Sequence, residues 1–577
     1  MSKVVVAIDF GTCGTTFAYA FNDAKDTIIY ADWNLPKSKN STEIILDDYN
    51  ETKFFGIDCE KYLSKESSSK EKFFHFKDIK MNLYNDIHFI QSTNKEQMIP
   101  INIIITKCLK YIKKKAISEI QARRPIIKEN DIKWILTVPA IWKDKCKDIM
   151  IKAAKKAKIL NRSNAELFLA LEPEAAAYEY FYNTASDKNL ISINNPYIIC
   201  DLGGGTVDIT THQRINENGK IIIEELYPPI GGYNGSTLIN KEFKNRILKK
   251  IFGEAYDRLM NCIQNPDENG LLYSDWCDLE DQIENFKIQL SLENVKNKET
   301  ERINCNIFKE FIEKNFSINQ LINNYNNNCP NEWKIQKYVQ FKIYFPYKII
   351  YDLTKELMID KVVKSINMIS KEVTNIQTII YAGSVSKNEA IREMIKKEFP
   401  NIKNHICSIF PSTAVVSGAV YFGFEPFLIY YRRAKYTFGI DCDDIWNERY
   451  NDRPEKKYWD NKEKGYFCKE CFQKYIEINE KIAVNSIIIK NFKMPDPKCH
   501  IILYKTNKID AKYIDEKDEK GNNILSKFGE IFFDIGDSFD PNNTEIKIEI
   551  KIGGTFITAK ATHIYSSKEV LNIFEFL

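Results

Sequence analysis

The feature of this sequence that most restricts its fold is a strand–turn–strand pattern that occurs twice. Residues 4–14 form an apolar run that ends at Asp9 and continues into a glycine turn, and residues 197–208 repeat this order with Asp201 at the strand end. A second β-rich segment follows each turn. A repeat of one device, at an offset of 192 residues from Asp9 to Asp201, predicts a duplicated fold whose two lobes face one cleft.

Glycine is scarce and unevenly placed. The chain contains 22 glycines in 577 residues, about half of the average usage of about 7%. Because glycine tolerates close approaches and backbone conformations that other residues do not, a chain that avoids it elsewhere is expected to need it where it clusters. Nine glycines fall in four clusters: Gly11 and Gly14; Gly203, Gly204 and Gly205; Gly231, Gly232 and Gly235; and Gly383.

The two repeated turns have the chemistry of a phosphate clamp. Consecutive backbone N–H groups at glycines form an anion-binding nest. The strand after each turn and the missing Gly-Lys-Ser/Thr sequence exclude the helix-terminated P-loop. An aspartate beside the nest would repel bare phosphate unless Mg²⁺, through its waters, bridges the two groups. We interpret the pair of turns as a nucleotide site, with a purely structural duplication as the alternative.

The other two glycine clusters precede expected helices. Gly231–Gly235 lies before a helix that should begin near Ser236, where a helix N-terminus either holds phosphate or is simply capped. Gly383-Ser384 ends an expected strand and opens a helix, where an adenine or ribose ring would fit against bare backbone.

The pattern of expected secondary structure changes near residue 428. Before it, helical patterns such as Ile101–Arg123 alternate with short apolar strands; after it, short β-rich segments are separated by Pro, Asn, Asp and Gly. We expect an α/β domain over residues 1–428, a linker over 429–435 and a smaller all-β sandwich over 436–577.

Composition argues against several classes of function. Lysine plus arginine (82) nearly balance aspartate plus glutamate (79), for a net charge of +3, which argues against a nucleic-acid partner. No run of about 18 apolar residues predicts a membrane span, and the N-terminus lacks a signal-peptide pattern, so we expect a cytoplasmic protein. Among 14 cysteines, only Cys468 and Cys471 form a C-x-x-C pair. We expect free thiols there, with a redox or metal site as the alternative.

Five motifs, in this order, resemble those of the 70-kDa heat-shock protein (DnaK-like) family within the actin-like ATPase superfamily. They are Ile8-Asp-Phe-Gly-Thr12, Leu136-Thr-Val-Pro-Ala140, Leu171-Glu-Pro-Glu-Ala-Ala-Ala177, Asp201-Leu-Gly-Gly-Gly-Thr-Val-Asp208 and Gly383-Ser384. Trp142, Lys80–Tyr84 and Arg432–Gly439 are most similar to the divergent member 12 branch of this family. The resemblance covers nearly the whole chain and implies an α/β duplicated actin-like (ribonuclease H-like) ATPase domain with two lobes, followed by a β-sandwich.

The resemblance also implies a role for each matching residue. Two carboxylates would hold Mg²⁺ through water: Asp9 and Asp208. Four residues would be catalytic, placing the γ-phosphate and the attacking water: Lys80, Glu172, Asp201 and Thr206. The remaining residues would contact ATP or ADP: Gly11, Thr12, Cys13, Gly14, Gly203, Gly204, Gly205, Gly231, Gly232, Glu284, Lys287, Ser291, Gly383 and Ser384.

Departures from the family pattern predict weaker nucleotide binding than in the main chaperones. Cys13 stands where a threonine is usual, and three residues replace charged residues around the base: Ile288, Ser386 and Ser412. The usual acidic, leucine-rich linker sequence is absent. By the same resemblance, a chain ending at Leu577 has no room for the helical lid.

These observations lead to one primary interpretation and two alternatives. We expect an ATP- and Mg²⁺-binding chaperone or chaperone-related protein that hydrolyses ATP slowly and couples nucleotide state to binding of a client protein or peptide, with co-chaperones as further partners. The first alternative is a nucleotide-sensing scaffold that binds ATP without a productive chaperone cycle. The second, a small-molecule kinase of the same superfamily, fits the clamp but not the β-rich tail.

Overall fold

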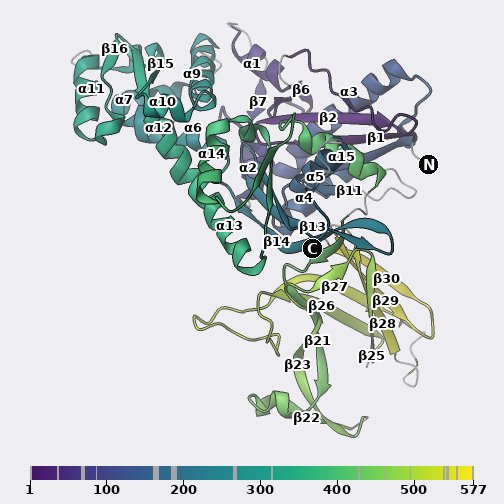
Figure 1. Cartoon of the computed structure of the whole chain (residues 1–577). Coiled ribbons are helices and arrows are strands. Elements are labelled where there is room, and N and C mark those ends of the chain that lie inside the picture. Colours follow the sequence, from purple (N-terminus) through teal and green to yellow (C-terminus); the bar gives the residue numbers. More distant parts are fainter. Residues whose placement is uncertain are drawn as a thin grey trace. The chain divides into compact units, whose positions relative to one another are not determined.

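Figure 1 presents the computed structural model of the chain, which forms two compact units. The first comprises Met1–Thr210 and Pro229–Glu425, and the second comprises Thr211–Pro228 and Pro426–Leu577. The expected boundary at residue 428 falls within 426–428, outside the described residues. The described residues are 3–35, 38–65, 72–85, 87–159, 168–183, 191–263, 270–313, 316–425, 429–461, 463–493, 496–536, 540, 545–553 and 556–574.

The first glycine turn belongs to a six-stranded sheet of the first unit. Its members are β1 (Val4–Phe10), β2 (Gly14–Phe21), β3 (Ile29–Tyr30), β4 (Asn40–Ser41), β10 (Ile132–Val138) and β11 (Phe168–Leu171). The order is β11-β10-β1-β2-β3, and β4 also pairs with β2. All of β1 is buried, because it lies between its parallel neighbour β10 and its antiparallel neighbour β2. The turn between β1 and β2 therefore follows a central, well-fixed strand.

The second glycine turn belongs to a second sheet. In the first unit this sheet has the order β19-β18-β12-β13, with bounds β12 (Tyr197–Leu202), β13 (Val207–Glu217, of which the residues up to Thr210 belong to this unit), β18 (Thr378–Ala382) and β19 (Asn404–Cys407). Strand β14 (Lys220–Gly232) belongs to the second unit up to Pro228. Strand β12 is buried throughout and runs parallel to β18, which runs parallel to β19. As in the first sheet, the glycine turn follows a buried strand that has a parallel neighbour.

Helix α15 (Ala414–Phe424) packs against β1 and against a second helix, α5 (Glu172–Asn183). Residues 414–423 of α15 are all buried. Helix α5 begins directly after β11, so that Glu172 lies at a strand end in the same sheet as Asp9.

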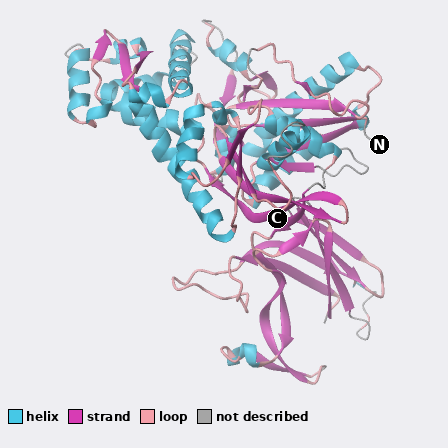
Figure 2. Cartoon of the chain, in the orientation of Figure 1, coloured by secondary structure: helices cyan, strands magenta, loops and turns pink. Residues whose placement is uncertain are grey.

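The first unit contains further helices and small sheets, whose secondary structure is coloured in Figure 2. Its other helices are α1 (Ile57–Leu63), α2 (Ile79–Tyr84), α3 (Ile101–Arg123), α4 (Asp144–Lys156), α6 (Ser236–Phe243), α7 (Lys249–Phe252), α8 (Glu254–Ile263), α9 (Gly270–Ile288), α10 (Leu292–Lys296), α11 (Ile318–Asn327), α12 (Tyr347–Thr354), α13 (Asp360–Glu372) and α14 (Glu389–Glu398). Its small sheets contain β5 (Ile44–Asp47), β6 (Thr52–Phe55), β7 (Phe73–Phe76), β8 (Phe89–Gln91), β9 (Met98–Pro100), β15 (Thr300–Asn304), β16 (Lys337–Val339) and β17 (Lys342–Pro346). These mixed sheets and many helices fit the expected α/β ATPase-like fold.

The second unit is built mainly from strands. One sheet has the order β22-β23-β21-β26-β27 and another has the order β25-β28-β29-β30. Both contribute to one hydrophobic cluster, which joins Phe438, Leu503 and Phe533 of the first sheet to Ile548 and Ala559 of the second. The bounds are β21 (Thr437–Ile445), β22 (Lys457–Asp460), β23 (Gly465–Ile476), β25 (Ser486–Lys493), β26 (Lys498–Thr506), β27 (Ser526–Asp534), β28 (Glu545–Gly553), β29 (Phe556–His563) and β30 (Glu569–Phe574).

The segment expected as a linker contains a strand, β20 (Ile429–Arg433). Within the second unit, β20 pairs in parallel with β14 at Ile223 and antiparallel with β24 (Lys481–Ala483). Buried Glu224 lies 3.6 Å from Arg433 and 3.0 Å from Lys481, measured between charged atoms. Residues 429–433 are therefore held by a sheet and by ion pairs.

Candidate functional site

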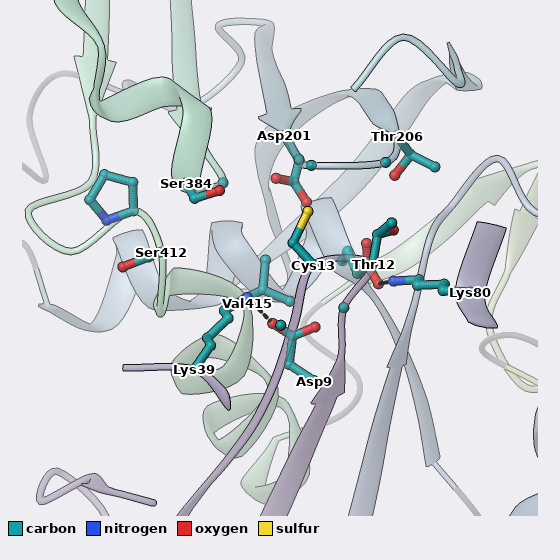
Figure 3. Close-up of a pocket in the computed structure, with 18 residues that line it drawn as sticks. Asp9, Thr12, Cys13, Lys39, Lys80, Asp201, Thr206, Ser384, Ser412 and Val415 are labelled. Atoms are coloured by element: carbon teal, nitrogen blue, oxygen red, sulfur yellow. Dashed lines mark hydrogen bonds and ion pairs between the residues drawn. The ribbon is translucent and has the colours of Figure 1, made fainter. Parts of the chain in front are cut away.

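One cleft in the first unit brings most of the predicted site residues together. It encloses about 570 Å³, counting the part open to solvent, and Figure 3 shows its lining. The predicted residues that line it are Asp9, Gly11, Thr12, Cys13, Gly14, Lys80, Glu172, Asp201, Gly203, Gly204, Gly205, Thr206, Gly383 and Ser384. Ser412, noted as a departure from the family pattern, also lines the cleft, with Lys39, Pro411 and Val415.

The two glycine turns face each other across this cleft. A Cβ atom on Gly204 would lie 2.4 Å from Sγ of Cys13, and one on Gly205 would lie 2.3 Å from Oγ1 of Thr12. Both distances are shorter than any real contact between such atoms, so a side chain at either position would force the Cys13 or Thr12 side chain to move. The duplicated sequence pattern thus corresponds to two turns in direct apposition.

The third glycine cluster holds the second turn in place. The backbone N–H groups of Gly235, Ser236 and Thr237 donate hydrogen bonds to the carbonyls of Gly205, Gly203 and Gly204 at 3.2, 3.2 and 2.9 Å. The first N–H groups of helix α6 are thereby used within the protein. Neither Gly231 nor Gly232 lines the cleft, so direct contact of this cluster with phosphate stays a prediction.

The fourth cluster fixes a third side of the cleft. Gly383 follows β18 with φ of 82°, a conformation that L-residues with side chains rarely adopt. A Cβ atom there would lie 2.3 Å from the Leu202 carbonyl oxygen and 2.4 Å from Oδ1 of Asp201. Gly383 therefore allows the end of β18 to pack directly on the end of β12.

Asp9 is the carboxylate that the cleft holds most firmly ionised. It accepts hydrogen bonds from Nζ of Lys39 at 2.5 Å and from Oγ1 of Thr137 at 3.2 Å. Burial alone would raise the pKa of Asp9, but Lys39 and then Lys80 outweigh it and hold the pKa below its usual value.

The other two carboxylates of the cleft, Glu172 and Asp201, have raised pKa values, and so does Asp208, which does not line the cleft. Burial raises the pKa of Asp201 well above its usual value, and Glu172, Asp208 and Asp9 add repulsion. Burial likewise raises the pKa of Glu172 to about 7 and that of Asp208 above its usual value. A cleft that gathers carboxylates without full compensation is suited to an additional cation.

Lys80 lies in the cleft as a buried partner of Glu172. Its side chain is 5% exposed, and Nζ lies 2.6 Å from Oε1 of Glu172. The same ammonium lies 5.4 Å from the ring centroid of Trp142, within the range of a cation–π interaction. Helix α2, which begins at Ile79, supplies this lysine from outside both large sheets.

The oxygen donors at the cleft fit a hard cation such as Mg²⁺. Oδ1 of Asp208 accepts a hydrogen bond from the Ile141 backbone N–H at 3.0 Å. Its Oδ2 is buried and makes no hydrogen bond within the part of the chain that is described. Asp208 does not line the cleft, so its contact with Mg²⁺ stays a prediction, whereas Asp9 lines the cleft and is engaged by Lys39.

Of the residues predicted to lie around adenine and ribose, Gly383 lines the cleft, whereas Glu284, Lys287 and Ser291 do not. Lys287 donates to Oε2 of Glu284 at 2.6 Å and to the Ser236 carbonyl at 3.4 Å, and Asn240 also donates to Glu284. Ser291 caps helix α10 by accepting from the Asn294 backbone N–H at 3.0 Å. Contact of these three residues with nucleotide stays a prediction.

Sequence reasoning missed Lys39, Pro411 and Val415. None of them belongs to a glycine turn or to a motif with fixed spacing. Lys39 enters the cleft because the next two residues form β4, which pairs with β2 at Gly14 and Thr15. The short β4 carries no periodic pattern, so the sequence offers no signal for this placement.

The C-x-x-C pair lies apart from the cleft residues, in the second unit. Cys468 and Cys471 are free and buried, and they form a small core with Tyr450 and Tyr513. Within the described ranges, no group of metal-ligating side chains includes either cysteine. Free thiols are what the sequence led us to expect.

The fold and the cleft together fit the class of α/β ATPase-like proteins. No profile of a known protein family matches the chain. More particularly, the chain is similar over its full length to heat shock 70 kDa protein 12A of Mus musculus, with 24% identity over an alignment of 651 positions that covers 100% of this chain and 91% of that protein.

Two human proteins extend this comparison. Heat shock 70 kDa protein 12A of Homo sapiens matches with the same identity and coverage, and heat shock 70 kDa protein 12B of Homo sapiens is 26% identical over 316 residues, 44% of this chain and 46% of that protein. The full-length similarity confirms the resemblance to the divergent member 12 branch. No helix among the described residues is long and apolar enough to cross a membrane.

Proposed function

We propose that this heat-shock-70-like protein binds ATP with Mg²⁺, hydrolyses it slowly and couples nucleotide state to binding of a client protein or peptide. The observation that carries the proposal is the apposition of two glycine turns in one cleft, beside the buried Lys80–Glu172 ion pair and the buried Asp201. Glycine N–H groups suit phosphate oxygens. Fixed charges around them favour phosphoryl transfer, which depends mainly on positioning and electrostatics.

In this proposal each of three consecutive parts of the chain has its own function. Residues 1–428 form a two-lobed actin-like ATPase domain, residues 429–435 connect the domains, and residues 436–577 form a β-sandwich without a helical lid that binds the client. The hydrophobic cluster shared by the two sheets of the second unit supports a sandwich. Co-chaperones would act as further partners.

The residues of the cleft divide the chemistry among them. The ammonium of Lys80 positions the γ-phosphate and stabilises its charge, while Glu172 and Asp201 orient the attacking water and accept its proton. Thr206 and the glycines of both turns contact phosphate oxygens. Asp9 and Asp208 hold Mg²⁺ through water, and the bound ion supplies charge neutralisation at the phosphates.

Asp201→Asn is the variant that tests this function most directly. It keeps the shape of the side chain but removes its ability to accept a proton, so ATP turnover should fall by about 100-fold or more while ATP still binds. Phosphate release and ATP affinity, measured on the same samples, check this expectation. Asp257→Asn, at an exposed ion pair with Lys249, serves as the matched control. Equal turnover of wild type and Asp201→Asn would contradict the ATPase.

The coupling to a client is tested with the full chain. A fluorescent unfolded peptide should bind with different affinity in ATP and in ADP, and Asp201→Asn should keep the ATP-state affinity for longer. Identical peptide affinities in ATP and in ADP would contradict the proposed coupling. Absence of peptide binding in both nucleotides would contradict the proposed binding of a client.

A nucleotide-binding scaffold without turnover is the second candidate, and one observation favours it. The Asp9 carboxylate assigned to the metal already has Lys39 as a partner at 2.5 Å. Tight binding of ATP together with negligible phosphate release from the wild type would support the scaffold.

The same Asp201→Asn substitution should stabilise the protein at neutral and higher pH. The folded-state pKa of Asp201 is raised, chiefly by burial, so the folded protein retains a proton that the unfolded chain loses. Wild-type stability therefore falls as pH rises from the unfolded pKa through the folded pKa, and the variant escapes this loss. Denaturant unfolding in EDTA at about pH 5 and about pH 8 should give a gain of at least about 1 kcal/mol at the higher pH, since one pKa unit corresponds to about 1.4 kcal/mol. A gain that is equal at both pH values would contradict this explanation.

A further inference from the structure

Lys39 brings a second ammonium into the cleft, at a carboxylate assigned to the metal. Its Nζ lies 2.5 Å from Oδ2 of Asp9, and Figure 3 shows this side chain reaching the aspartate. The Lys39 side chain is 27% exposed, so it is in contact with the open part of the cleft. Lys80, the other lysine of the cleft, is paired with Glu172 instead.

The backbone fixes Lys39 at this place. Strand β4 begins at the next residue and pairs with β2, and Oγ1 of Thr42 donates to the Gly11 carbonyl at 2.8 Å. A Cβ atom on Gly14 would lie 2.9 Å from Cβ of Lys39. Because Gly14 has no side chain, the aliphatic part of Lys39 can pack against it. The position of Lys39 therefore depends on the first glycine turn.

The charge balance of the cleft explains why a lysine is favourable there. Asp9, Glu172 and Asp201 line the cleft with only two ammonium groups, Lys39 and Lys80. Burial would lower the pKa of Lys39, but Asp9 first, and then Glu172 and Asp201, hold it above its usual value. Lys39 therefore carries its charge at neutral pH and faces three carboxylates.

A hydrated Mg²⁺ and Lys39 would compete for the same Asp9 carboxylate. We propose that Lys39 is a built-in cation of the nucleotide site, which partly replaces Mg²⁺ at Asp9 and attracts the phosphates of ATP, so that ATP binding depends only weakly on Mg²⁺. This proposal rests on the proposed function, because it assumes that ATP occupies the cleft. It concerns the role of a residue that belongs to none of the motifs found in the sequence.

The test compares ATP affinity in Mg²⁺ and in EDTA by isothermal titration calorimetry of the full chain. For the wild type, we expect the dissociation constant to differ by less than about 10-fold between the two conditions. Lys39→Gln keeps a hydrogen-bond donor for Asp9 but removes the charge, so metal-free binding should weaken and the ratio should rise by about 10-fold, or about 1.4 kcal/mol. Lys39→Arg retains the charge and should retain the wild-type ratio.

Lys107→Gln provides a matched control, because Lys107 pairs with Glu51 at 2.6 Å and does not line the cleft. An unchanged ratio in Lys39→Gln overturns the role of Lys39 but leaves the proposed function intact. Failure of the wild type to bind ATP in either condition overturns the proposed function itself. If Lys39→Gln does not fold, the measurement on the wild type tests the proposal. A wild-type dissociation constant for ATP that is more than about 100-fold higher in EDTA than in Mg²⁺ overturns it.

Discussion

Gly204→Val is expected to lower the affinity for ATP by about 100-fold while the chain keeps its fold. A Cβ atom at this position would lie 2.4 Å from Sγ of Cys13, so either the Cys13 side chain must rotate or the two turns must move apart. Overpacking of this kind costs about 1–3 kcal/mol, and about 1.4 kcal/mol corresponds to a tenfold change in affinity. The two valine methyl groups also extend into the space between the turns. Calorimetric titration with ATP, beside circular dichroism of the same sample, measures both effects.

A second set of variants separates a clash within the protein from obstruction of the phosphate. Gly204→Ala alone should weaken ATP binding, because its Cβ meets the Cys13 sulfur. Cys13→Ala removes this sulfur, and Cβ of Cys13 lies 3.6 Å from the new atom, an ordinary contact. The double variant should therefore recover ATP binding if the clash is within the protein.

Gly465→Ala is the control for glycine loss. Its added Cβ would meet only ordinary contacts, 3.5 Å from Phe467 and 3.9 Å from the Glu463 carbonyl. Wild-type ATP affinity in Gly204→Val would contradict the assignment of this turn to the phosphates.

The glycine turns could be predicted from the sequence because they are local features. Each turn follows a continuous apolar strand and carries an aspartate at a fixed spacing. The second turn lacks side chains at Gly204 and Gly205, where Cys13 and Thr12 of the first turn approach. The repeat predicted that both turns belong to one site. Their apposition at Gly204 and Cys13 follows from the duplication, although the sequence does not give the distance.

Residues that reach the cleft through long-range pairing could not be predicted. Lys39 enters because β4 pairs with β2, and Pro411 and Val415 enter because α15 packs on β1. Neither contact leaves a periodic trace in the sequence. The i,i+3 pair Glu284–Lys287 was visible as a helical pattern, but the structure shows that its two members bind each other and α6.

The segment after residue 428 illustrates the same limit. Its sequence lacks the linker pattern of the heat-shock family. The absence of that pattern does not predict which secondary structure the segment forms. In the structure, Ile429 pairs with Ile223 of β14, a partner far away in the chain. Propensity alone does not identify such a partner, because the energy of a strand depends on the neighbour with which it pairs.

Lys80→Met should have the largest effect on folding stability of any substitution in the cleft, and this effect should depend on pH. The substitution removes the ammonium that lies 2.6 Å from Glu172 and leaves a buried carboxylate without its partner. Breaking a buried ion pair costs about 3–5 kcal/mol when the remaining charge stays ionised. However, burial already raises the pKa of Glu172 to about 7, and the loss of Lys80 raises it further, so Glu172 can take up a proton instead.

The sign of the pH dependence follows from this pKa. Below about pH 6, Glu172 is protonated in the folded variant and the loss of stability should be small. As pH rises above about 7, Glu172 of the folded wild type releases this proton and Glu172 of the folded variant does not, so the variant becomes progressively less stable than the wild type. Urea unfolding from about pH 6 to about pH 9 measures this trend. A loss of stability that is the same at every pH would instead assign the effect to the contact between Lys80 and Trp142.

A double variant, Lys80→Met with Glu172→Gln, separates stability from chemistry. Replacing both members of a buried pair by neutral groups removes the uncompensated charge, so most of the stability and its pH independence should return. ATP turnover should remain at least about 100-fold below that of the wild type, because both the ammonium assigned to the γ-phosphate and the Glu172 carboxylate assigned to the attacking water are absent. If turnover recovers together with stability, neither Lys80 nor Glu172 takes part in the chemistry, which must then be assigned to Asp201 and the glycine turns.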